Sequence, residues 1–212
     1  MVVYAIDIAL ITLIPIILVN YFVRIDKEYA PALKLTSTRK IGLAMLILAG
    51  LVALLSPGYC YLSTLQHLNS SFILAYLIFM SYTDTHTKML YSVVSAVMLV
   101  FEIIITMINA ERFQSDTYTL IIALGVLIIL AIFNLIGAGD VLIYTVIMLY
   151  LLQNRTVPTM SFILNVLMTN IMFVVVTVLK KLQSKDINIL HSHEPLTLFI
   201  YFGTLMTICL YI

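Results

Sequence analysis

The sequence predicts an all-α membrane protein with about eight transmembrane helices. Of its 212 residues, 63% are hydrophobic and only 10% are charged, and the mean hydropathy is +1.13. A soluble domain cannot bury that much apolar surface. The apolar residues also gather in runs, and a helix of about 20 such residues crosses a bilayer. There are eight runs: 2–23, 41–62, 69–83, 89–108, 118–136, 140–153, 157–179 and 196–212.

The first two runs predict a pair of N-terminal helices. Run 2–23 lacks a basic region before it and contains Asp7, so it is expected to be a retained span and not a signal peptide. The stretch from Arg24 to Lys40 is the longest polar one, and it contains Pro31. It predicts a short loop before the helix at 41–62.

Basic residues set the expected orientation, because Lys and Arg concentrate in cytoplasmic loops. With loop 24–40 inside and the spans alternating, nine cations fall inside and two, Arg112 and Arg155, fall outside. Both chain ends are then expected outside. The nine are Arg24, Lys27, Lys34, Arg39, Lys40, Lys88, Lys180, Lys181 and Lys185.

The uncharged stretch 118–136 and the run that follows it predict a helical hairpin. A single long helix here would place Lys180 and its neighbours outside, against the charge rule. Glycine tolerates the backbone geometry of a tight turn, so the turn is expected at Gly137-Ala138-Gly139. By the same alternation, the polar break at 81–88 faces the cytoplasm. The topology therefore puts Asp84 and Asp140 on one side of the membrane.

Asp140 is expected below the inner surface. Fourteen residues run from Asp140 to Gln153, about 21 Å of helix, whereas the hydrocarbon layer is about 30 Å thick. Acids at such depth are costly and tend to be functional.

Two close carboxyl groups are suited to peptide hydrolysis. At about 4 Å and an effective dielectric constant of about 20, two carboxylates repel by about 4 kcal/mol, so one stays protonated while the other is ionised. The carboxylate accepts a proton from water and the acid polarises a carbonyl. The sequence does not assign these roles between Asp84 and Asp140. The alternative interpretation is that each aspartate only ends a helix, with Asp84 as an N-terminal acid of the helix near 89.

Gly137-Ala138-Gly139-Asp140 resembles the Gly-x-Gly-Asp motif of the type IV prepilin peptidases, which are intramembrane aspartyl proteases. Asp84 with Thr85-His86-Thr87-Lys88 resembles the segment of the first catalytic aspartate in that family. The resemblance covers 69–212, which it implies is a six-helix aspartyl peptidase core behind two N-terminal helices in 1–68. It implies catalytic roles for Asp84 and Asp140.

The resemblance also implies which residues surround the two acids and where the protein works. Gly137, Gly139, His86 and Lys88 are expected to shape the site or bind substrate. The partner is expected to be a prepilin or pseudopilin precursor with a basic leader and a hydrophobic helix, cleaved at the cytoplasmic face of a prokaryotic inner membrane. No cofactor or metal is expected. A nucleic-acid partner is not expected either, since the sequence has no basic patch.

The chain departs from the family at three places. Tyr91 stands where a proline is frequent, and Leu142 where a lysine is frequent. Loop 24–40 is short and lacks the cysteine pairs of members that also methylate pilins, so methyl transfer is not expected. A small transporter that uses Asp84 and Asp140 for proton or cation coupling, and an inactive relative that binds a hydrophobic helix, remain as alternatives.

Three further acidic segments are not expected to take part. Asp7 is expected to be solvated or interfacial. Glu102 lies about 20 Å from the inner face, too far to join the pair. The loop His191-Ser192-His193-Glu194 offers three potential metal ligands without a fourth partner and is expected to be solvated.

Overall fold

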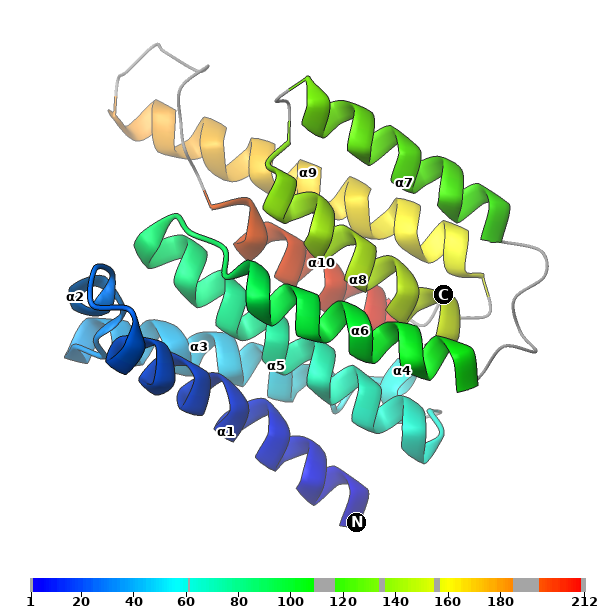
Figure 1. Ribbon diagram of the computed structural model, residues 1–212, viewed down its shortest axis with the longest axis horizontal. Coiled ribbons are helices and arrows are strands. Elements are labelled where there is room, and N and C mark those ends of the chain that lie inside the picture. Colours follow the sequence, from blue (N-terminus) through cyan, green and yellow to red (C-terminus); the bar gives the residue numbers. More distant parts are fainter. Residues whose placement is uncertain are drawn as a thin grey trace.

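The computed structural model describes residues 2–60, 62–108, 117–133, 136–154, 157–184 and 195–210. Every regular element in these ranges is an α-helix, which confirms the all-α prediction for this part of the chain (Figure 1). The long helices are α1 (Val2–Ile25), α3 (Ser37–Ala53), α5 (Thr64–Thr87), α6 (Ser92–Ile108), α7 (Thr117–Ile132), α8 (Ala138–Asn154), α9 (Pro158–Ser184) and α10 (Leu196–Leu210). Two single-turn helices, α2 (Ala30–Leu33) and α4 (Pro57–Cys60), join them.

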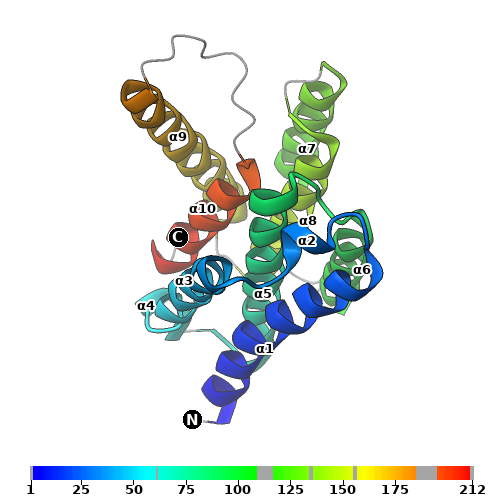
Figure 2. The same cartoon turned by 90° about the vertical axis from the view of Figure 1, so that its left-hand side faces the viewer.

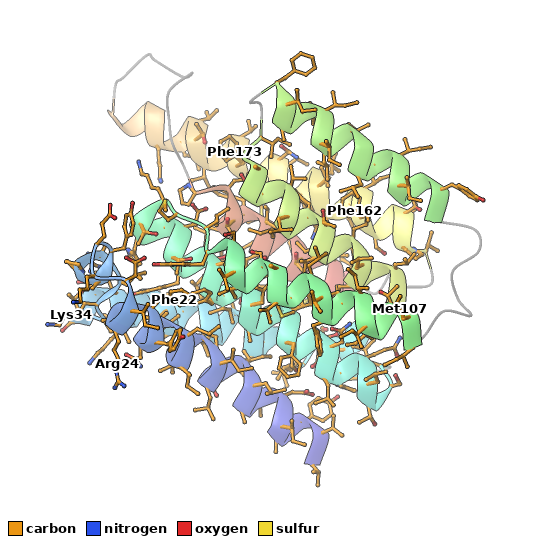
Figure 3. The ribbon with its side chains drawn as sticks, viewed as in Figure 1. Phe22, Arg24, Lys34, Met107, Phe162 and Phe173 are labelled. Carbon is orange, nitrogen blue, oxygen red and sulfur yellow. The ribbon has the colours of Figure 1, made fainter. Side chains whose placement is uncertain are left out.

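Two of the described helices are long and apolar enough to cross a membrane, Val2–Ile25 and Pro158–Lys180. Four shorter apolar helices lie in α6, α7, α8 and α10. Large apolar side chains cover the outside of these helices, as the stick view shows (Figure 3). Val97 on α6, Ile122 on α7 and Val174 on α9 are each more than half exposed. An apolar surface of this extent marks contact with a membrane or a partner.

Helix α5 is the centre of the bundle. Helices α1, α3, α6, α8 and α10 pack around it, whereas α7 packs on α8, and α9 packs on α8 and α10 (Figures 1 and 2). Its side chains from Ile73 to Asp84 are all buried. Because α5 is fixed along its whole length, the position of Asp84 at its end is fixed too.

Helix α5 is longer than the apolar run 69–83 that predicted it. A capping box starts it earlier, because the Ser63 backbone N–H donates to Gln66 Oε1 at 2.9 Å and the Gln66 N–H donates to Ser63 Oγ at 3.5 Å. Hydropathy misses this turn since its residues are polar. The expected boundary between residues 68 and 69 consequently falls inside α5.

The prediction of two helices in place of one is confirmed, but the expected turn at Gly137-Ala138-Gly139 is wrong in its position, because Ala138 and Gly139 already belong to α8. Helix α7 ends at Ile132 and α8 begins at Ala138, so 118–153 is two helices and not one. The Gly137 carbonyl accepts from the N–H groups of Asp140 at 3.0 Å and Val141 at 3.2 Å, which starts α8.

The expectation that Asp7 is solvated is wrong. Its side chain is fully buried, with Oδ2 3.3 Å from His67 Nδ1, and Ser71 Oγ donates to Oδ1 at 2.8 Å. The physical reason is the polar first half of α5, which supplies partners to an acid on α1. Buried charges require such pairing.

Glu102 is also fully buried, in a second polar cluster at the same end of the bundle. Asn69 Nδ2 donates to its Oε2 at 3.3 Å, and Gln153 Nε2 donates to the same oxygen at 3.0 Å. Asn69 is in the second turn of α5 and Asp84 is in its last, so these two ends of the helix are far apart. Glu102 therefore stays away from the two aspartates, as expected.

Helices α9 and α10 touch at a glycine. A Cβ at Gly203 would lie 2.5 Å from Thr169 Oγ1 and 3.0 Å from the Asn165 carbonyl oxygen. Small residues at helix interfaces permit this close approach. Asn165 Nδ2 also donates to Thr204 Oγ1 at 2.9 Å across the contact.

Gly203→Val is expected to destabilise the protein by about 1–3 kcal/mol, because the added methyl groups force the two backbones apart. The measurement is thermal unfolding in detergent, compared with Gly125→Val. A Cβ at Gly125 meets nothing within 4 Å, and the two changes carry the same helix-propensity cost. Equal melting temperatures for both variants would show that α9 and α10 do not touch here.

Candidate active site

Four segments meet around a cavity at one end of the bundle. The end of α5, the link to α6, the start of α8 and the start of α10 all reach it (Figure 1). Its volume is about 540 Å³. It is lined by Asp84, Lys88, Met89, Leu90, Ser92, Gly137, Gly139, Asp140, Pro195 and Leu196. The structure thus brings both aspartates, 56 positions apart in the sequence, to one space.

Asp84 is fixed by the helix that comes last in the chain. Its Oδ2 accepts from the Thr197 backbone N–H at 3.1 Å, in the first turn of α10. Ser81 Oγ, one turn earlier on α5, donates to the Thr197 carbonyl at 3.2 Å. A carboxylate at a helix N-terminus is favoured by the free N–H groups there.

The alternative interpretation of Asp84 as an N-terminal acid of the following helix is wrong. Asp84 lies in the last turn of α5, whereas α6 begins only at Ser92. A last-turn position is electrostatically unfavourable for an acid. The contact with α10 offsets this cost and holds the carboxyl group at the cavity wall, 9% exposed.

Asp140 lies in the first turn of α8 and its side chain turns back over Gly137. A Cβ at Gly137 would be only 2.9 Å from Asp140 Oδ2. A side chain at position 137 would therefore displace the carboxyl group. The first glycine of the Gly-x-Gly-Asp motif is needed here for space next to the acid.

The second glycine of the motif makes a different contact. A Cβ at Gly139 would lie 2.5 Å from Leu90 Cδ1 and 3.2 Å from Leu90 Cβ. Leu90 belongs to the link that follows α5. Gly139 thus lets the start of α8 approach the segment next to Asp84, and this approach sets how far apart the two acids are.

Of the two residues near Asp84 that were expected to shape the site, Lys88 lines the cavity and His86 does not. Lys88 follows the last residue of α5 in a left-handed conformation with φ of 54°. Its backbone N–H donates to the Asp84 carbonyl at 2.9 Å, and the residue lines the cavity.

His86 does not line the cavity. Two residues are about 200° around a helix, so His86 points away from Asp84 and packs edge-on against Tyr82, with ring centres 4.6 Å apart. The expectation that His86 shapes the site has no support in this arrangement.

Tyr91 is a residue whose role the sequence did not indicate. Its hydroxyl donates to Asp26 Oδ2 at 2.9 Å, and its ring lies 4.1 Å from the ring of Phe22. Both partners lie at the end of α1. Burial, and then the hydrogen bond to Asp26, raise the pKa of the Tyr91 hydroxyl, so it remains the donor. The link at 88–91 is therefore tied to the end of α1.

Tyr91→Phe is expected to loosen this link without altering its apolar packing. Loss of the hydrogen bond costs about 0.5–1.5 kcal/mol, so the melting temperature is expected to fall. The measurement is thermal unfolding in detergent. Tyr21→Phe is the control, since Tyr21 is 55% exposed on the same end of α1. Equal behaviour of the two variants would contradict a positioning role for Tyr91.

The cavity lies at the basic end of the bundle. The eight Lys and Arg residues of the described part all fall in elements at this end, and Figure 3 labels Arg24 and Lys34 there. They are Arg24, Lys27, Lys34, Arg39, Lys40, Lys88, Lys180 and Lys181. Arg112, Arg155 and Lys185 lie outside the described residues.

The carboxyl pair is the main chemical feature of this cavity. A pair of carboxyl groups in one space performs acid and base chemistry when one is protonated and the other ionised. Among the described residues, no group of three His, Cys, Asp or Glu side chains could hold a metal ion. The loop with His191, His193 and Glu194 lies outside them.

Comparison with known proteins gives no further assignment. No family model, no curated protein and no solved structure matches this chain. The function of the cavity therefore has to be inferred from its own residues.

Proposed function

We propose that this protein is a membrane-embedded aspartyl endopeptidase that removes the leader peptide from prepilin-like or pseudopilin precursors. The observation that carries the proposal is the meeting of Asp84 and Asp140, from α5 and α8, in one cavity. The Gly-x-Gly-Asp turn supports it, since both glycines are needed to place the second acid.

In this proposal all eight long helices span the bilayer, with the cavity at the cytoplasmic face and both chain ends outside. Two supports are the exposed apolar side chains around the bundle and the basic residues at the cavity end. Helix α8 has 17 residues, about 25 Å, which is shorter than the hydrocarbon layer of about 30 Å. Its first turn, with Asp140, then lies in a recess below the inner surface.

The chemistry follows from the carboxyl pair. One carboxylate takes a proton from a water molecule, while the other, protonated carboxyl group donates a hydrogen bond to the scissile carbonyl. Water adds to the polarised carbonyl carbon, and the proton passes to the leaving amine as the C–N bond breaks. Gly137 and Gly139 leave room for a substrate backbone next to Asp140.

Peptidase activity without methyl transfer is proposed. The segment between α1 and α3 spans only 26–36 and contains one helical turn, α2. It has no cysteine. The enlarged loop of the bifunctional relatives is therefore not present here.

Co-expression with prepilin-like precursors tests the proposal. Each precursor should carry a short basic leader, a glycine at the junction and a hydrophobic helix. Loss of the leader, read by mass spectrometry of the product N-terminus, is the expected result. A panel of such precursors that all keep their leaders in the presence of correctly inserted protein would contradict the proposal.

A proton- or cation-coupled transporter is the second candidate, and one observation favours it. Besides the cavity pair, the bundle buries Asp7 against His67 and Glu102 against Asn69 and Gln153 at its opposite end. Buried acids at both ends of a bundle are found in proton pathways. Ion-dependent uptake into vesicles that is lost on Glu102→Gln, with no precursor cleavage, would favour the transporter.

A further inference from the structure

A second cavity adjoins the one that holds the two aspartates. Its volume is about 490 Å³, and it lies between α9, α10 and the end of α5. Lys88 and Pro195 line both cavities. An extended chain that passes Asp84 and Asp140 therefore continues directly into this second space.

The second cavity exists because α9 and α10 diverge. The two helices touch at Gly203 and Thr169, and they separate toward Lys180 and Pro195 (Figure 2). Phe173 and Phe199 meet edge-on with ring centres 5.5 Å apart, on the way to the open end. The result is a groove that is closed deep in the bundle and open beside the aspartates.

The walls of this groove are mainly apolar. Met172 and Val176 line it from α9, and Phe199 and Phe202 line it from α10. Met172 and Lys180 are eight positions apart, about 12 Å along a helix. That depth accommodates about two turns of an apolar helix.

The charged residues that line the groove are both cations, Lys88 and Lys180, whereas in the first cavity Lys88 is accompanied by the acids Asp84 and Asp140. The two cations stand at the open end of the groove, next to the first cavity. A basic segment is repelled from this position, whereas an apolar segment without charge is not. The groove therefore favours the hydrophobic helix of a substrate over its basic leader.

We propose that the α9–α10 groove binds the first two turns of the hydrophobic helix that follows the scissile bond. The basic leader then lies on the other side of Asp84 and Asp140, near Gly137 and Ser92. This inference rests on the proposed peptidase function and adds a direction to it.

Two adjacent valines of α9 test this assignment in the full-length protein. Val176→Trp places a large ring in the groove. Val175→Trp is the matched control, because Val175 is 49% exposed and does not line the groove. Val176→Trp is expected to raise KM for a helix-bearing precursor about tenfold or more, the effect of losing one well-buried apolar contact. Val175→Trp is expected to leave KM unchanged.

A photo-crosslinking amino acid at the same two positions gives the second readout. Position 176 is expected to capture the precursor through its hydrophobic helix, and position 175 is not. Equal KM values for the two tryptophan variants, or capture of phospholipid without precursor at position 176, would overturn the groove assignment while cleavage itself persists. If the unaltered protein cleaves no precursor, the proposed function fails and this inference fails with it.

Discussion

Asp84→Asn and Asp140→Asn are each expected to abolish leader removal while the protein still folds and inserts. An amide has the shape of a carboxyl group but neither accepts a proton from water nor donates one to a leaving group. General acid and base catalysis contributes about 10²–10⁴-fold each, so either change is expected to lower the rate by at least about 10²-fold. The measurement is the rate of precursor processing by purified protein in detergent or vesicles.

The control for this pair is another buried acid of the same bundle. Glu102 is fully buried on α6 and does not line the cavity. Glu102→Gln is therefore expected to retain processing. If Asp84→Asn and Asp140→Asn each process the precursor as well as Glu102→Gln does, the two aspartates do not act as the catalytic pair.

Gly139→Ala is expected to reduce activity with little loss of insertion. The added methyl group meets Leu90 Cδ1 at 2.5 Å and Leu90 Cβ at 3.2 Å. The first contact is relieved by moving a flexible side chain, but the second requires the link at 88–91 to shift. A misplacement of about 1 Å costs about 10²-fold in rate, so a shift of a few tenths of an ångström at this contact is expected to lower the rate by up to about tenfold.

The same clash allows a rescue experiment. Leu90→Gly removes every side-chain atom that the new methyl group meets, Cβ included, so Gly139→Ala with Leu90→Gly is expected to regain much of the lost rate. Gly42→Ala is the control, since a Cβ there meets nothing within 4 Å. Additive losses in the double variant would show that Gly139 and Leu90 are not in contact.

Much of the helical framework was predictable because hydropathy reports apolar length. The eight runs correspond to the eight long helices, and the hairpin at Gly137 followed from charge alternation. The early start of α5 was not predictable from hydropathy, because Ser63 and Gln66 start it with polar contacts. The short helix α2 lies in the predicted loop 24–40, and α4 lies inside the run 41–62, which was expected to be a single helix but is divided after Ala53.

The site was predictable only in part, because the sequence pattern reports local features and not the contacts between residues that are distant in the chain. Topology put Asp84 and Asp140 at one end of the bundle, and glycine spacing marked the turn beside the second acid. The contacts of Thr197 with Asp84, and of Asp26 with Tyr91, join residues 113 and 65 positions apart. Such pairings depend on the packed bundle and leave no local signal. The burial of Asp7 was missed for this reason too, since His67 and Ser71 are on another helix.

Cysteine accessibility in intact cells tests the central claim most directly. Lys88→Cys and Ala138→Cys place thiols at exposed positions beside Asp84 and Asp140, in a chain whose Cys209 is replaced by alanine. The native Cys60 is exposed at the opposite end of the bundle and serves as the outside marker. The account predicts that an impermeant reagent labels Cys60 from outside, and labels positions 88 and 138 only after the cytoplasmic face is opened. Labelling of positions 88 and 138 from opposite faces would contradict it.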